Sequence, residues 1–195
     1  MKKVPHVESV ARTDIPAGQA TAFAPRRRTV ALAGASALLL VMSAVRPGAA
    51  ATLPDNVRAA LGRFADPSVA MKEGYEPGPC VSGPTGGAMG IHFVNADYLK
   101  DDAIDAKKPE AVLYEPTADG KLALVGVEYI TFKGPAALDG QLFNFNTAPN
   151  RYGLDPFYEL HVWAWKPNRN GMFADWNPDV SCEAATPEQT AGGHH

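Results

Sequence analysis

The chain has few of the residues on which common catalytic motifs depend. Its 195 residues include two cysteines and five histidines, and no H-x-H, H-E-x-x-H or C-x-x-C pair occurs. After residue 51 the serines are Ser68, Ser82 and Ser181, and none lies in a G-x-S-x-G motif, which argues against a serine hydrolase. The glycine-rich run GPTGGAMG at 83–90 lacks the lysine and hydroxyl residue of a P-loop and precedes an expected strand, so nucleotide binding is disfavoured.

Long hydrophobic runs are scarce as well. The run from Val30 to Val45 follows the arginines Arg26–Arg28 and precedes the small residues Ala49–Ala51. At 16 residues it is shorter than the roughly 20 that a membrane-spanning helix needs. The arrangement predicts an export signal in residues 1–51, cleaved near Thr52, so we expect a periplasmic or secreted protein without stable membrane insertion. The last two of these arginines also fit a twin-arginine signal, although an ordinary secretory signal would look similar.

Basic residues are unevenly distributed. Seven of the 18 Lys and Arg but two of the 21 Asp and Glu lie in residues 1–51, which leaves 11 basic and 19 acidic residues and a formal charge of about −8. A surface of this sign disfavours nucleic acid and anionic lipid. We therefore expect a metal ion or a small molecule as the partner, and the oligomeric state stays open.

The two cysteines, Cys80 and Cys182, both follow the expected cleavage point. In an oxidising compartment, two cysteines in a small domain most often form a disulfide. We expect this pairing, which would leave neither sulfur free as a nucleophile.

The remaining pattern predicts one β-rich domain over residues 52–182, followed by a flexible tail at 183–195. An amphipathic helix is expected at 55–65, capped by Asp55, with a further short turn of helix after it. The Gly- and Pro-rich stretch 74–87 is interpreted as an irregular loop.

Strands are expected at 89–94, 111–115, 122–132 and 157–165, with weaker segments near 142–145 and 172–176. The pair Asp119-Gly120 is typical of a hairpin turn. The predicted fold is therefore mainly β with an N-terminal helix, an antiparallel meander that forms an open barrel or a strongly bent sheet.

Three titratable residues lie within apolar, strand-like segments, namely His92, Glu128 and His161. Because side chains alternate along a strand, each shares a face with apolar neighbours. A buried polar group without a partner costs about 1 to 3 kcal/mol, so we expect these residues to meet.

A divalent-metal site is the leading interpretation, with His92, Glu128, His161 and Glu115 as candidate ligands. Imidazole and carboxylate together suit Zn, Fe, Mn or Cu, and an open position would allow catalysis. Glu110 or Glu159 could join or replace Glu115.

Two alternatives need no metal. The same residues could form a buried hydrogen-bond network that stabilises the fold. They could also hold an organic ligand stacked on Trp163 or Trp165, with Tyr129 as a further cofactor-binding candidate.

Four stretches, GAMGIHFVN (87–95), PEAVLYEP (109–116), LVGVEY (124–129) and HVWAWKPNRNGMFADWNPDVSC (161–182), resemble a family of exported bacterial proteins without an assigned activity. The resemblance covers most of the chain after the export signal and implies no catalytic residue. It does imply that His92, Glu115, Glu128 and His161 belong to family motifs.

Overall fold

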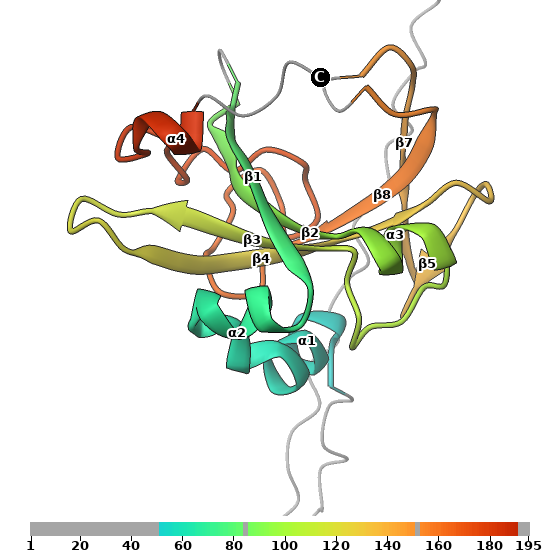
Figure 1. Cartoon of the computed structure of the whole chain (residues 1–195). Helices are drawn as coiled ribbons and strands as arrows, with labels where there is room; N and C mark the ends of the chain where they lie inside the picture. Colours follow the sequence, from blue (N-terminus) through green and yellow to red (C-terminus); the bar gives the residue numbers. More distant parts are fainter. Residues whose placement is uncertain (1–50, 84–85, 151–152, 191–195) are drawn as a thin grey trace, which may run out of the picture. The chain divides into compact units, whose positions relative to one another are not determined.

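The structure of the chain is a computed structural model, and it describes residues 51–83, 86–150 and 153–190 (Figure 1). Apart from Ala51, the predicted export signal lies outside these residues. No helix within the described ranges has the length and apolar character that crossing a membrane requires.

Six antiparallel strands form the main sheet, in the spatial order β1-β2-β3-β4-β8-β7. Their bounds are β1 Tyr75–Ser82, β2 Ala88–Asn95, β3 Ala111–Pro116, β4 Leu122–Thr131, β8 Phe157–Val162 and β7 Asn144–Asn146. A two-stranded sheet joins β5 (Ala137–Leu138) to β6 (Gln141–Leu142), α3 (Ala96–Asp101) links β2 to β3, and α4 (Pro187–Thr190) lies in the expected tail. The mainly β, antiparallel prediction is confirmed. The barrel-like or strongly bent form is not found, because β1 and β7 stay at opposite edges of a sheet that is not closed.

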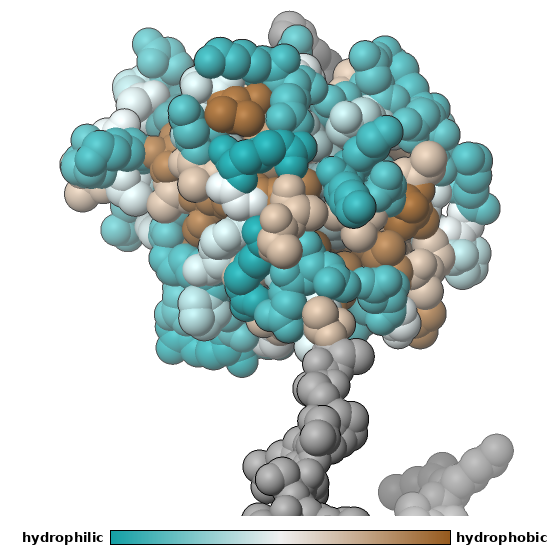
Figure 2. Space-filling view, turned by 90° about the horizontal axis from the view of Figure 1, so that it is seen from below, coloured by the Kyte–Doolittle hydropathy of each residue, from teal (hydrophilic) through white to brown (hydrophobic). Residues whose placement is uncertain are grey.

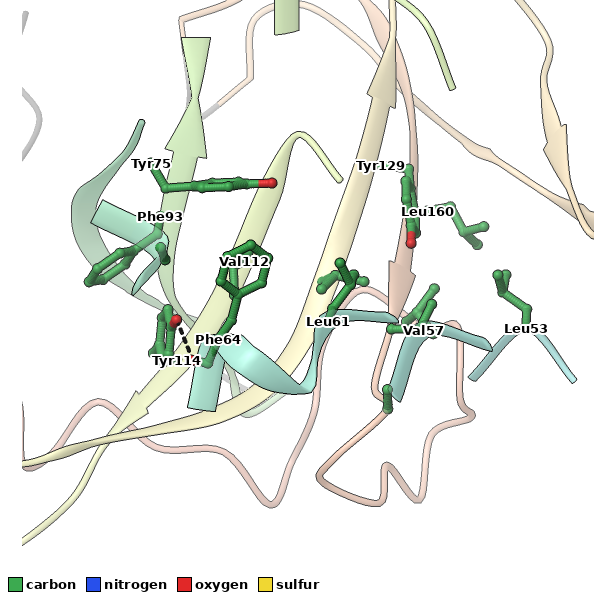
Figure 3. Packing of buried hydrophobic residues seen from close by; sticks show 14 of the residues in the cluster. Leu53, Val57, Leu61, Phe64, Tyr75, Phe93, Val112, Tyr114, Tyr129 and Leu160 are labelled. Atoms are coloured by element: carbon green, nitrogen blue, oxygen red, sulfur yellow. Dashed lines mark hydrogen bonds between the residues drawn. The ribbon is translucent and has the colours of Figure 1, made fainter. Parts of the chain in front are cut away.

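Helices cover one face of this sheet, and their start differs slightly from the prediction. Helix α1 (Leu53–Leu61) begins two residues earlier than expected, because Thr52 rather than Asp55 is the N-cap and the two form a capping box. A 3-10 turn, η1 (Gly62–Ala65), and α2 (Pro67–Lys72) continue the helical region. Their apolar side chains pack on β2, β3, β4 and β8 in the helix-side core, where the Tyr114 hydroxyl donates to the Phe64 carbonyl at 2.7 Å (Figure 3).

The outer surface on the helix side is mostly hydrophilic, and its hydrophobic patches are separated from one another (Figure 2). Val57, Leu61 and Phe64 point inward and are completely buried. The apolar side chains of the helical region are therefore buried against the sheet.

The predicted loop at 74–87 is wrong for most of its length, since Tyr75–Ser82 is strand β1. Pro77 and Pro79 lack an N–H, but β1 is an edge strand, where that donor is not needed on the outer side. The register with β2 shifts between Pro77 and Cys80, so an irregularity absorbs the poor strand formers.

The opposite face of the sheet is covered by residues 163–182, which we call the cover segment. Strand β8 ends at Val162 instead of continuing to Trp165, because the Trp163 N–H donates to the Met172 carbonyl at 3.1 Å and the chain turns away. No strand forms at 172–176. A second apolar cluster, the cover-side core, holds Ala88, Leu113, Val125, Trp163 and Val180.

A disulfide between Cys80 and Cys182 attaches the end of the cover segment to β1, as predicted. The cover segment also lies very close to the backbone just before β2, at Gly87, which has φ +89°. A Cβ there would lie 2.2 Å from the Asn177 carbonyl oxygen. The glycines before β2 thus let the cover segment lie directly on the sheet.

Candidate metal site

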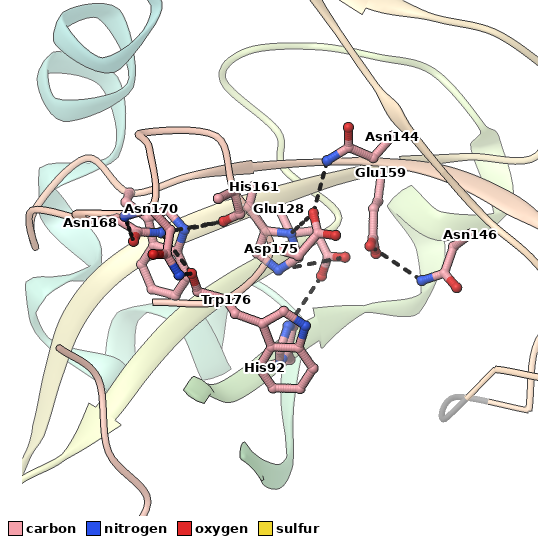
Figure 4. A network of polar contacts seen from close by, with 12 residues as sticks. His92, Glu128, Asn144, Asn146, Glu159, His161, Asn168, Asn170, Asp175 and Trp176 are labelled. Carbon is pink, nitrogen blue, oxygen red and sulfur yellow. Dashed lines mark hydrogen bonds and ion pairs between the residues drawn. The ribbon is translucent and has the colours of Figure 1, made fainter. Parts of the chain in front are cut away.

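His92, Glu128 and His161 lie together on the face beneath the cover segment. Glu128 on β4 stands directly opposite His161 on β8. His92 comes from β2 and reaches them across β3, where it pairs with Leu113. Their neighbours along the strands point the other way, into the helix-side core, as period-two alternation requires. The predicted grouping of these three residues is therefore what the sheet produces (Figure 4).

The distances within this group approach those of a metal site. His92 Nε2 lies 3.3 Å from Glu128 Oε2, and His161 Nε2 lies 4.0 Å from Glu128 Oε1. One ligand atom from each residue lies within 4.8 Å of the other two. Zinc bonds of about 2.0–2.1 Å at tetrahedral angles place ligand atoms about 3.3 Å apart. Small side-chain movements would therefore close the group around an ion.

Ala111 on β3 lies between the strands that carry His92 and Glu128, and its side chain is small. Ala111 is completely buried and pairs with Val94 on one side and Glu128 on the other. Its methyl group is short, so the side chains of His92 and Glu128 can meet over β3. The two imidazole rings are perpendicular, with centroids 5.9 Å apart.

The other edge of His161 faces the cover segment. Its Nδ1 lies 3.7 Å from Oδ1 of Asp175, and that oxygen accepts a hydrogen bond from the Asn144 side chain at 2.9 Å. The Asp175 side chain is 33% exposed, whereas those of Glu128 and His161 are at most 1% exposed. His161 therefore lies between an enclosed carboxylate and one that reaches solvent.

Glu159 forms part of a second group around the same histidine. It lies two residues before His161 on β8, is 2% exposed, and accepts a hydrogen bond from Asn146 at 3.2 Å. One ligand atom each from Glu159, His161 and Asp175 lie within 4.8 Å of one another. The sequence pattern does not decide whether Glu159 joins the site, and it misses Asp175, Asn144 and Asn146. Asp175 lies in a loop, where no periodicity assigns a side chain to a face.

Burying the polar side chains of this cluster costs free energy unless each of them has a strong partner. His161 is completely buried, and neither of its ring nitrogens makes a hydrogen bond within the described part of the chain. The nearest carboxylate oxygens to them are the 4.0 Å and 3.7 Å neighbours on Glu128 and Asp175. Polar groups in such a position gain most from a strong direct partner. A cation between the histidine and a carboxylate would provide one.

Two candidate ligands lie elsewhere. Glu115 lies next to the last residue of β3, away from the cluster, where it accepts hydrogen bonds from the Lys166 ammonium and, at 3.0 Å, from the Ser181 N–H. Glu110 points away from the histidines and is completely buried, with Oε2 accepting the Ile130 N–H at 2.9 Å. Burial raises the pKa of Glu110 to about 8. Neither carboxylate belongs to the group around His92.

The aromatic residues that were candidates for binding a ligand pack against other parts of the protein. Tyr129 pairs with Leu160 on the opposite face and donates to the Ala106 carbonyl at 2.8 Å, so it cannot contact a ligand of the histidines. Trp163 is 1% exposed and stacks on His161 with centroids 6.0 Å apart. Its Nε1 donates to the Ala174 carbonyl, while Trp165 packs at the margin of the helix-side core. Trp163 thus orients His161 and offers no open ring face to an organic ligand.

Comparison with protein-family models, with curated proteins and with solved structures finds no match. The family resemblance drawn from the sequence therefore stays a prediction. The side chains themselves define a class of site: His, Glu and Asp groups that could hold a metal ion. Function is inferred from this chemistry, because a fold alone does not specify it.

Proposed function

We propose that this protein binds a divalent transition-metal ion through Nε2 of His92, Nε2 of His161 and the carboxylate of Glu128. The observation that carries the proposal is that three strands bring these ligand atoms within 4.8 Å of one another on a buried face. Two imidazoles and one carboxylate form a ligand set that zinc and non-haem iron use, with manganese and copper as further candidates.

The surroundings of His161 support the same assignment. A metal-bound histidine usually directs its other ring nitrogen to a carboxylate, which fixes the tautomer and orients the ring. Asp175 occupies that position at Nδ1, held in turn by Asn144. The stacked Trp163 restricts the imidazole from its flat side. A ligand oriented in this way loses little conformational freedom when the ion binds.

The disulfide indicates a non-reducing compartment. We propose that the protein is exported and, if the twin-arginine route is used, that the folded domain crosses the membrane with its metal already bound.

The competing interpretation is a structural network without metal, for which the 3.3 Å contact between His92 and Glu128 is the relevant observation. Such a pair can stabilise a buried face by charge-assisted hydrogen bonding alone. The two interpretations differ in what happens when metal is supplied or removed. An organic ligand has less support, because Trp163 is covered.

Elemental analysis and metal titration distinguish these functions. The full chain carries His194→Ala and His195→Ala, because the terminal histidines could bind metal independently. We expect one Zn²⁺ or Co²⁺ per chain and a higher melting temperature with the ion than after chelation. Co²⁺ absorption would report whether the bound ion is tetrahedral.

Matched carboxamide variants make the test specific. Glu128→Gln and Glu110→Gln each replace a buried carboxyl group by a carboxamide of nearly the same shape, at exposures of 1% and 0%. Glu128→Gln should weaken metal binding at least 100-fold, while Glu110→Gln should leave it unchanged. Absence of stoichiometric metal, or equal loss in both variants, contradicts the proposal.

A further inference from the structure

The imidazole of His161 presents its two nitrogens to two different groups of ligand atoms. The inner group is His92, Glu128 and His161 Nε2. The outer group is Glu159, Asp175 and His161, and here too one ligand atom from each residue lies within 4.8 Å of the others. On this side Nδ1 of His161 lies 3.7 Å from Asp175 Oδ1. One histidine is therefore common to both groups (Figure 4).

Acidic residues that lie close together do not by themselves make a cation site, but the outer group contains a buried acceptor without a hydrogen bond. Glu159 is 2% exposed, and only its Oε1 accepts a hydrogen bond, from Asn146. Its Oε2 has no hydrogen-bond partner among the residues that the structure describes. Leaving such an oxygen buried is costly, and a cation beside it would remove that cost.

Strand β7 orients both carboxylates of the outer group. Asn144 and Asn146 are two residues apart, so their side chains share one face of this edge strand. Asn144 donates to Asp175, and Asn146 donates to Glu159. Amide donors of this kind hold metal-binding carboxylates in place.

We propose that the outer group is a second subsite for the same class of divalent cation, through which the ion reaches the inner group. This inference rests on the proposed metal binding at the inner group. Because Asp175 is 33% exposed while Glu128 is 1% exposed, the outer group is the side nearer to solvent.

The ion occupies one group at a time, because a neutral imidazole has a single free lone pair. With the ion at Nδ1, the ring proton is on Nε2 and faces Glu128 Oε1 at 4.0 Å. With the ion at Nε2, the proton is on Nδ1 and faces Asp175 Oδ1 at 3.7 Å. When the ion moves from Nδ1 to Nε2, Nε2 releases its proton to solvent and Nδ1 takes one up from the solvent beside the partly exposed Asp175, so the ring carries one proton before and after the transfer.

Variants that affect one group only provide the test. His92 belongs to the inner group and Glu159 to the outer group, so we compare His92→Gln, Glu159→Gln and the double variant, all in the full chain with His194→Ala and His195→Ala. Co²⁺ alone is the probe. Stoichiometry and affinity come from titration against a chelator, and the association rate comes from stopped-flow absorption.

His92→Gln should still bind one Co²⁺, at least 100-fold more weakly and with a changed absorption spectrum, because the ion then stays in the outer group. The double variant should bind none. Glu159→Gln should bind one ion with an association rate at least tenfold slower.

Loss of all binding in His92→Gln, equal binding in His92→Gln and the double variant, or an unchanged association rate in Glu159→Gln overturns the outer subsite. Two ions bound at once by the parent chain would also overturn it. If the parent chain binds no metal but His92→Gln does, the proposed function fails and the outer subsite stands. Circular dichroism of each metal-free variant establishes that it is folded, and His92→Asn replaces His92→Gln if the latter is not.

Discussion

Replacing Glu110 by glutamine should change how the stability of this protein depends on pH. The carboxyl group is completely buried just before β3, and its Oε1 makes no hydrogen bond in the described ranges. Burial is the largest influence and raises its pKa from 4.5 to about 8, against the opposing effect of the Ile130 N–H. The folded protein therefore keeps a proton that the unfolded chain releases near pH 4.5.

The sign of the effect follows from proton binding. Between pH 4.5 and about 8 the unfolded chain binds fewer protons at this residue than the folded protein, so the free energy of unfolding falls as pH rises. The difference between the two pKa values corresponds to about 5 kcal/mol at most, of which about 3 kcal/mol is lost by pH 7. The substituted glutamine side chain has no proton to lose, and its amide oxygen can still accept the Ile130 N–H.

The free energy of unfolding of both proteins is measured by urea titration, followed by tryptophan fluorescence, at pH 5, 6, 7 and 8 with a chelator present. Stability of Glu110→Gln relative to the parent should increase by several kcal/mol from pH 5 to pH 8. Contributions from the other side chains are the same in both proteins and cancel in the difference. Glu76→Gln, at an exposed position, is the control and should show no such trend. A difference that stays constant with pH would refute the reasoning from burial.

Three further predictions concern the cover and the site. Replacing Cys80 and Cys182 by alanine opens a loop spanning 102 residues and should lower the free energy of unfolding by up to about 4.7 kcal/mol in urea titrations; a loss below about 1 kcal/mol would contradict it. Ala111→Leu fills the space between His92 and Glu128 and should weaken Co²⁺ binding at least tenfold in chelator competition, and unchanged affinity would argue against the inner group. Asn146→Leu removes the amide that orients Glu159 and should slow Co²⁺ association in stopped-flow measurements, whereas an unaltered rate would show that this orientation is unimportant.

The candidate ligands could be predicted from sequence because three of them lie in regular strands. His92, Glu128 and His161 each interrupt an apolar segment, and alternation alone assigns them to a face. Which strands are neighbours is not contained in that pattern. Glu128 and His161 meet because β8 pairs with β4 although β5, β6 and β7 intervene in the chain.

The parts of the site that the sequence does not reveal lie where local rules are weakest. Asp175 comes from the cover segment, whose course depends on backbone contacts with β4 and β2. Asn144 and Asn146 come from a three-residue edge strand that has no apolar alternation. Glu115 is a candidate in the sequence because the register of its hairpin is open by a residue or two, but hydrogen bonds from Lys166 and Ser181 hold it at the end of β3.

The wrong predictions of secondary structure also lie where local sequence rules are weak. The stretch from 74 to 87 resembles a loop because Gly and Pro are poor strand formers, yet an edge strand tolerates them where its outer N–H groups need no partner. Trp163 and Trp165 continue the apolar pattern of β8, and only the bonds from the Trp163 N–H to Met172 and from the Ala164 N–H to Val162 show that the strand has ended.

The late position of β8 in the chain affects the order of events during synthesis. A nascent chain that stops before Phe157 contains β2, β3 and β4 with His92 and Glu128, but the outer edge of β4 still lacks its neighbour. An unprotected edge of this kind can pair with another molecule and start aggregation. Metal added at that stage would find two ligands out of three, so loading should follow release of the finished chain from the ribosome.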